Sequence, residues 1–286
     1  MISVIIAAHN EEAVIGRCLD ALADGGLPMQ VIVSANGCRD ATVEVARSRN
    51  VFVVERAEAG KPGALNAAEQ IATGSARIYL DADIFVPPGS IAALVEALDA
   101  ERGFLAVVPR RHVDISGRPW PVRAYFRINQ RLPAFRTGLF GRGLIVISEI
   151  GRSRFEEFPE LIADDLFLDA QFADREKIEV GAVTVVVESP RTTGSLFKRL
   201  VRVRRGNAEM RRAAAEGGVD SVVRRSDRWS WLRDVVLRQP WLALDAVAYV
   251  GITMLAAYRA RRAPRGDWGR DESTRMPAQE AGRAAR

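Results

Sequence analysis

Strands and helices alternate through the first 90 residues, and this alternation constrains the fold more than any other feature of the sequence. Apolar runs at 2–8, 30–34, 51–55 and 78–80 have the length and composition of buried strands. Segments with helical periodicity or helix-starting residues separate them. The resulting β-α-β-α-β-α-β order predicts an α/β fold with a doubly wound, mostly parallel sheet flanked by helices.

The fourth strand runs directly into two carboxylates, Asp81 and Asp83. Charged groups at the end of an apolar strand should not lie unpaired in the core. If the chain stays extended, residues i and i+2 point to the same side, so both side chains aim at one point outside the sheet. Two such oxygen ligands favour Mg²⁺ or Mn²⁺. The alternative is a surface turn ahead of a helix, because Pro87-Pro88-Gly89-Ser90 follows.

Polar residues also follow the earlier strands, where α/β proteins hold their ligands. His9-Asn10-Glu11-Glu12 follows the first strand, and the segment 35–42 follows the second. Asn10 is equally suited to cap the next helix. Lys61 lies in a glycine-bearing loop at 59–63, where it meets a phosphate or is simply solvated.

The region from 90 to 190 supplies a second carboxylate pair, Asp164-Asp165, ahead of a helix expected at 166–172. Asp164 is suited to a helix N-cap, but adjacent like charges also raise one pKa, and a carboxylate with a raised pKa suits a general base. The glycines at 138, 141 and 143 indicate either close approach to a ligand or tight turns. The other elements expected are helices at 90–98 and 121–132, strands at 104–109, 144–148 and 178–187, and a mobile loop at 110–120.

The last hundred residues differ in character. Residues 191–212 carry eight basic side chains against one acid, Glu209, at roughly helical spacing, so the face is either solvated or suited to a diphosphate. Residues 241–258 are apolar except for Asp245, and tryptophans and arginines flank them. This stretch suits a helix that spans a membrane, lies on it, docks on the domain or forms a dimer contact. The domains expected are 1–190, 191–262 and a disordered tail at 263–286.

Composition excludes several classes. The net charge of +5 and pI of about 9.7 favour anionic partners, but no nucleic-acid motif is present, so no nucleic acid is expected. G-x-G-x-x-G and Walker sequences are missing, which argues against a dinucleotide enzyme or a P-loop ATPase. Two cysteines without metal-site spacing, and no signal-peptide pattern after Met1, predict a cytoplasmic protein.

Six motifs, taken in order over about residues 1–210, resemble those of inverting family-2 glycosyltransferases with the GT-A fold. They are Ala8-His9-Asn10-Glu11-Glu12, the segment 35–42, Gly60-Lys61-Pro62-Gly63-Ala64-Leu65-Asn66, Asp81-Ala82-Asp83, Asp164-Asp165 and Arg202-Val203-Arg204-Arg205-Gly206-Asn207. The family's Gln-x-x-Arg-Trp has only an Arg-x-x-Arg-Gly counterpart here, which argues against processive polymer synthesis.

The resemblance implies a nucleotide-diphosphate sugar donor and a divalent metal, Mn²⁺ or Mg²⁺. Backbone near Ala8, with Asn10, Glu12 and Asn36, would hold the base and ribose, and Lys61 and Asp81 would lie near the ribose and diphosphate. Asp83 would bind the metal with help from Asp81. Asp165, beside Asp164, would be the catalytic base. Arg202 and Arg205 would help the nucleoside diphosphate leave.

The function expected is sugar transfer to a saccharide or lipid-linked hydroxyl acceptor, in cell-surface polysaccharide or glycolipid synthesis at the inner face of the cell membrane. A nucleotidyltransferase and a non-catalytic membrane scaffold with a degenerate transferase domain are the alternatives. A homodimer is compatible with the apolar helix. The sugar, the base and the acceptor are not encoded in any motif of the sequence.

Overall fold

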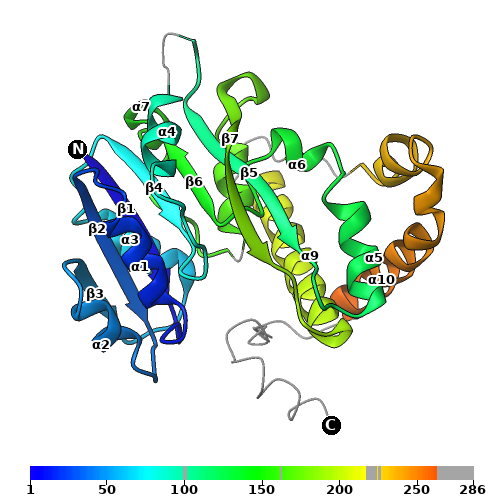
Figure 1. Cartoon of the computed structure of the whole chain (residues 1–286), viewed down its shortest axis with the longest axis horizontal. Coiled ribbons are helices and arrows are strands. Elements are labelled where there is room, and N and C mark those ends of the chain that lie inside the picture. The colour runs from blue at the N-terminus through cyan, green and yellow to red at the C-terminus, as the bar shows by residue number, and fades with distance from the viewer. Residues whose placement is uncertain (99–101, 162, 217–223, 225–226, 263–286) are drawn as a thin grey trace.

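The computed structural model describes residues 1–98, 102–161, 163–216, 224 and 227–262. A seven-stranded sheet with the order β3-β2-β1-β4-β6-β5-β7 organises the chain (Figure 1). The strands are β1 (Ile2–Ala8), β2 (Met29–Asn36), β3 (Phe52–Arg56), β4 (Ala76–Leu80), β5 (Ala106–Asp114), β6 (Leu144–Ile147) and β7 (Lys177–Glu188). Among the strands of the described residues, only β6 pairs antiparallel with its neighbours, β4 and β5. The predicted mostly parallel sheet is confirmed.

Helices cover both faces of this sheet. The α-helices of the described residues are α1 (Ile15–Ala23), α2 (Thr42–Arg47), α3 (Lys61–Glu69), α4 (Ser90–Glu96), α5 (Trp120–Asn129), α6 (Ala134–Thr137), α7 (Glu149–Arg152), α8 (Asp164–Ala170), α9 (Thr193–Ala215) and α10 (Ala243–Arg262). Along β1, Val4 and Ile6 join the core with α1 and α4, whereas Ile5 joins the core with α3 and α8. Burial on both faces explains why β1 reads as one continuous apolar run.

Strand β5 is longer than the sequence indicates. Residues 110–114, predicted as part of a mobile loop, pair with 184–188 of β7 after a register shift at Pro109/Arg110. This part of β5 is only half-buried: Arg110 is exposed, while Val113 packs on α5. Polar residues are therefore tolerated in this strand, and the loop prediction was wrong for 110–114.

The C-terminal helices pack on α5 at the end of the molecule opposite β3 (Figure 1). Leu196 of α9 joins an apolar cluster with Tyr125 of α5, and Tyr249 of α10 stacks on Tyr125 with ring centroids 5.1 Å apart. Asp245 of α10 is buried and lies 3.3 Å from Arg127 Nη1 of α5. One face of α10 is thus docked on the domain.

One described helix, Pro240–Arg262, is long and apolar enough to cross a bilayer, with a mean hydropathy of 1.5 in its apolar window. A single helix of this kind is weak evidence for spanning, because core helices of soluble proteins have the same composition. The tail predicted to be disordered, 263–286, lies outside the described residues.

Candidate functional site

The carboxyl ends of β1 and β2 are joined by the side chain of Asn36. Its Nδ2 donates to the carbonyl of Ala8 over 2.8 Å, and its Oδ1 accepts from the N–H of Gly60 over 3.0 Å. Because Asn36 is buried, these bonds fix the two strand ends and the loop that enters α3 as one unit. Its contact with a nucleotide, like that of the backbone near Ala8, stays a prediction.

Asn10 and Glu12 connect the loop after β1 to the loop after β2. Asn10 has a left-handed φ of 53° and accepts from the N–H of Arg39 over 2.8 Å. Glu12 Oε2 accepts from the N–H of Ala41 over 2.8 Å. Helix α1 begins later, without a side-chain cap, so the helix-capping alternative for Asn10 was wrong. The two loops form one polar wall at the sheet edge, while their ligand contacts stay predictions.

The aspartates after β4 lie in a turn rather than in an extended strand. Strand β4 ends at Leu80, and the N–H of Ile84 donates to the carbonyl of Asp81 over 3.1 Å. The expectation that the strand continues through Asp83 was therefore wrong. Burial raises the pKa of Cys18 to about 12, and the charges of Asp83 and Asp81 add to the rise. The negative charges of both carboxylates therefore disfavour ionisation of this buried thiol of α1.

Lys61, at the start of α3, joins the two aspartate pairs. Its Nζ lies 2.7 Å from Asp81 Oδ1 and 2.8 Å from Asp164 Oδ2. Burial alone would lower the pKa of Lys61, but the two carboxylates outweigh it and raise this pKa above its usual value. The solvated alternative for Lys61 was wrong. So was the N-cap alternative for Asp164, since Asp164 lies inside α8 and makes this ion pair instead.

Asp165, next to this ion pair, has the properties of a base. Its Oδ2 accepts from the N–H of Gly141 over 3.1 Å. Burial raises the pKa of Asp165 to about 6, with a further rise from Asp164, while Lys61 and the Gly141 N–H oppose it. The group is ionised at neutral pH but holds a proton more strongly than an ordinary carboxylate.

Sequence analysis did not assign Gly141 or Gly143 to the site, although the density of glycines gave a signal. Gly143 has a φ of +68°, and its carbonyl accepts from the N–H of Asp81 over 2.8 Å. A Cβ at Gly143 would lie 2.5 Å from Ile84 Cγ1 and 3.1 Å from Asp81 Oδ2. The backbone after α6 therefore approaches both aspartate pairs closely, which a side chain would prevent.

Helix α9 passes beside α8, because Met210 shares a core cluster with Leu166 and Phe167. Arg202 and Arg205 lie one to two turns before Met210 and are partly buried. The predicted basic helix is therefore present and adjoins α8, the helix that carries Asp165. Contact between these two arginines and a diphosphate stays a prediction.

The donor set suits a divalent ion only in part. Among the residues that the structure describes, no group of three or more His, Cys, Asp and Glu side chains is placed to hold a metal. Asp81 and Asp83 supply hard oxygen ligands, and Gly143 leaves room beside Asp81. Such a pair fits Mn²⁺ or Mg²⁺ when substrate oxygens and water complete the shell.

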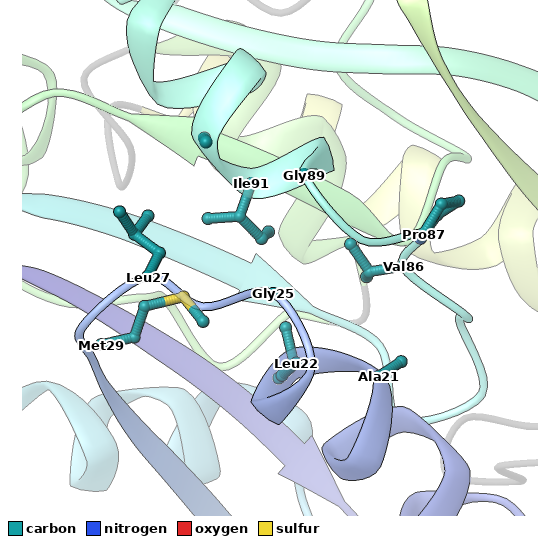
Figure 2. Close-up of a pocket in the computed structure, with 10 residues that line it drawn as sticks. Ala21, Leu22, Gly25, Leu27, Met29, Val86, Pro87, Gly89 and Ile91 are labelled. Atoms are coloured by element: carbon teal, nitrogen blue, oxygen red, sulfur yellow. The ribbon is translucent and has the colours of Figure 1, made fainter.

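A small apolar pocket lies elsewhere. Figure 2 shows it between the end of α1, the chain entering β2 and the segment 86–91. Its lining includes Leu22, Leu27, Val86 and Ile91, and none of the described residues that line it has a polar side chain. The pocket and the candidate site lie at opposite ends of β2. Met29, the first residue of this strand, lines the pocket, whereas Asn36, its last residue, lies at the candidate site. Without converging polar groups, this pocket is not a candidate active site.

Comparisons with known proteins identify a family and a shared fold. A model of Glycosyl transferase family 2 matches residues 3–150. Two curated relatives are the 4,4'-diaponeurosporenoate glycosyltransferases of Staphylococcus aureus strains bovine RF122 / ET3-1 and USA300, 35% and 32% identical over 117 residues. Each match covers 38% of this chain and only 31% of the relative. The solved mannosyltransferase PcManGT from Pyrobaculum calidifontis, in complex with GDP-Man and Mn²⁺, shares the fold. Its TM-score is 0.59 at 21% identity, covering 100% of this chain and 80% of that chain.

Proposed function

Because the chain belongs to glycosyl transferase family 2, we propose that it moves a sugar from a nucleoside-diphosphate sugar to a hydroxyl acceptor with inversion. The observation that carries this proposal is the pair of contacts from Lys61 to Asp81 and Asp164. The family match ends at residue 150, so the second aspartate pair lies outside it. Through Lys61, the ion pairs bring Asp81, which is proposed to lie near the diphosphate, close to the Asp164-Asp165 pair, which contains the candidate base. A single displacement needs both groups in one site.

The donor side is assigned to the loops after β1, β2 and β4. Ala8, Asn10, Glu12 and Asn36 belong to the polar wall at this edge, and this wall is assigned to the base and ribose. The mannosyltransferase PcManGT, which shares the fold, was crystallised with a nucleotide sugar and Mn²⁺.

Asp83, assisted by Asp81, is assigned to Mn²⁺ or Mg²⁺. A divalent cation held there would neutralise part of the charge on the departing diphosphate. Lys61 brings a further positive charge to the same place, and Arg202 and Arg205 of α9 add two more. The enzyme is therefore expected to depend on the metal for donor binding.

Asp165 is assigned the role of base toward the acceptor hydroxyl. Its Oδ2 is held by the Gly141 N–H, which leaves Oδ1 to take the proton. Its pKa of about 6 keeps it ionised at neutral pH while making it a stronger base than an ordinary Asp. Asp164, fixed by Lys61, holds a negative charge beside it and sustains the raised pKa.

Helix α10 is assigned to the cytoplasmic face of a membrane, lying flat. Its outward face, together with Trp241 just before the helix begins, carries apolar side chains that are each more than half exposed: Trp241, Leu244, Val247, Met254, Leu255 and Tyr258. We call this set the α10 stripe. Arg259, Arg261 and Arg262 follow at the end of the helix, where they suit anionic headgroups. The acceptor is accordingly a saccharide or lipid-linked compound of the cell surface.

The domain division expected from the sequence is kept as part of the proposal: a catalytic unit at 1–190 and an appendage at 191–262. Packing of α9 and α10 on α5 supports it. A second copy of the chain is the competing occupant of the α10 stripe, and the homodimer expected from sequence would use it. No nucleic acid is part of the proposal.

A thermal-shift screen of nucleotide sugars with and without Mn²⁺ tests the proposal, because a ligand that binds the native state raises its melting temperature. One nucleotide sugar should stabilise the wild type in a Mn²⁺-dependent manner. Asp83→Ala should lose this effect, and Asp24→Asn, an exposed control on the end of α1, should keep it. With that donor, release of a nucleoside diphosphate supports the proposal. Release of pyrophosphate would indicate a nucleotidyltransferase, and failure of every nucleotide to bind would indicate a scaffold.

A further inference from the structure

Arg111 and the candidate base Asp165 both lie near the backbone of Gly141. Its Nη2 donates to Asn129 Oδ1 over 3.3 Å, its Nη1 lies 3.5 Å from the carbonyl of Gly141, and its guanidinium lies 3.9 Å from the centroid of the Phe135 ring. The N–H of the same Gly141 donates to Asp165. An anion that contacts Arg111 therefore lies in the same part of the molecule as the candidate base.

Helix α9 brings two more arginines to this place. Leu196 and Leu200, on either side of Arg199, pack with Tyr125 of α5. Arg204 lies close to both Tyr125 and Tyr249, whose pKa values its charge lowers against the larger effect of burial. The Nε of Arg204 is buried and has no hydrogen-bond partner. We call Arg111, Arg199 and Arg204 the acceptor-side arginines.

Positive charges crowd Arg111, and Glu179 offsets them only in part, because the pKa of Arg111 stays below its usual value. Burial lowers the pKa of Arg111 to about 10, and the charges of Arg142 and Arg199 lower it further. Arg142 differs, because it pairs with Glu179 and donates to backbone carbonyls. Within the described part of the chain, none of the acceptor-side arginines forms an ion pair with a carboxylate. Like charges that are partly desolvated favour binding of an anion.

We propose that the acceptor-side arginines bind a negatively charged group, phosphate or carboxylate, of the acceptor. The inference rests on the proposed function and narrows its substrate class to hydroxyl compounds that carry an anionic group. The Tyr125–Tyr249 stack places α10 beside the same cluster. An acceptor at a membrane surface can therefore present its headgroup here while its hydroxyl faces Asp165.

Inorganic phosphate tests the cluster in the full-length protein, by thermal shift at constant ionic strength with chloride as the reference anion and a chelator present. Phosphate should raise the melting temperature of the wild type. Arg199→Gln and Arg204→Gln should each require about tenfold more phosphate for the same rise, because each removes a charged hydrogen-bond donor. Lys198→Gln, an exposed neighbour on α9, is the matched control and should respond as the wild type does.

Equal phosphate responses in the wild type and both variants would overturn the inference, as would an equal loss in Lys198→Gln. Vesicles of phosphatidylglycerol and of phosphatidylcholine then identify the source of the anion. Stabilisation by phosphatidylglycerol alone, lost in both variants, assigns a lipid headgroup, and stabilisation by phosphate alone assigns a soluble acceptor. Nucleotide-sugar stabilisation is measured in parallel. Its absence from the wild type defeats the proposed function, whereas its presence with unchanged phosphate responses defeats only this inference.

Discussion

Replacing Asp165 with Asn should stabilise the fold at neutral pH while it abolishes transfer. The pKa of Asp165 rises from 3.8 to about 6, mainly because burial disfavours the charge, and this net rise includes the opposing effects of Lys61 and Gly141. A rise of about two units corresponds to at most ~3 kcal/mol in the free energy of unfolding. Asn keeps a carbonyl oxygen for the Gly141 N–H but carries no charge to bury.

The pH dependence follows from the sign of this shift. A carboxyl with a raised pKa favours folding in its protonated form, so this stabilisation is complete below pH 3.8 and is lost as the pH rises through about 6. Asp165→Asn should therefore match the wild type near pH 3.8 and exceed its free energy of unfolding at pH 7.5. Loss of the base should lower kcat by ~10²–10⁴-fold.

Urea unfolding of both proteins at several pH values measures the difference, and transfer assays measure kcat. Asp24→Asn is the control for loss of a carboxylate at an exposed position, and it should change neither quantity. A variant that is less stable than the wild type at pH 7.5 would refute the argument from burial. Wild-type activity in the variant would refute the assignment of the base.

Three further predictions follow from the same contacts. Lys61→Met removes the charge that opposes the raised pKa of Asp165, so the acid limb of the kcat/KM profile should move to higher pH; an unchanged or lower midpoint contradicts this. Gly143→Ala should lower the free energy of unfolding by ~1–3 kcal/mol, because its φ is positive and its Cβ would overlap Ile84. Gly117→Ala, at a similar φ but with open space around it, should lower the free energy of unfolding by less in the same urea titration. Equal losses in the two variants would contradict the argument from overlap with Ile84. The triple variant Leu244→Ser, Val247→Ser, Met254→Ser should reduce co-sedimentation with anionic vesicles without lowering the melting temperature. Phe52→Ser, an exposed apolar residue of β3, is its control, and equal sedimentation of all three proteins contradicts membrane docking.

The first part of the fold, in which strands and helices alternate, was predictable because its central strands are buried on both faces. Such strands read as continuous apolar runs, as residues 2–8 do, and the loops between them are short. The extension of β5 was not predictable from its own residues. Residues 110–114 are mostly polar, and the partner that makes them a strand, 184–188 of β7, is distant in sequence. Pairing between distant segments overrides local propensity there.

The candidate site was predictable as a set of groups but not as an arrangement. Each aspartate pair stands out because carboxylates beside apolar runs are costly unless they have partners. Their union through Lys61 depends on how α3 and α8 pack, which no local pattern encodes. The same holds for Gly141, whose N–H reaches Asp165 only because the loop after α6 folds back onto α8.

The contacts of α10 with α5 favour a helix that lies on a membrane over one that spans it. To span, α10 would have to leave α5, break the contact between Asp245 and Arg127 and give up the stack of Tyr249 on Tyr125. Asp245 lies in the first turn of α10, so spanning would also leave this carboxylate near the end of the helix without its Arg127 partner. Lying flat keeps both contacts and still removes the α10 stripe from water, at about 25 cal/mol per Å² of apolar surface. In that orientation β3, at the other end of the molecule from α10, would remain in water (Figure 1).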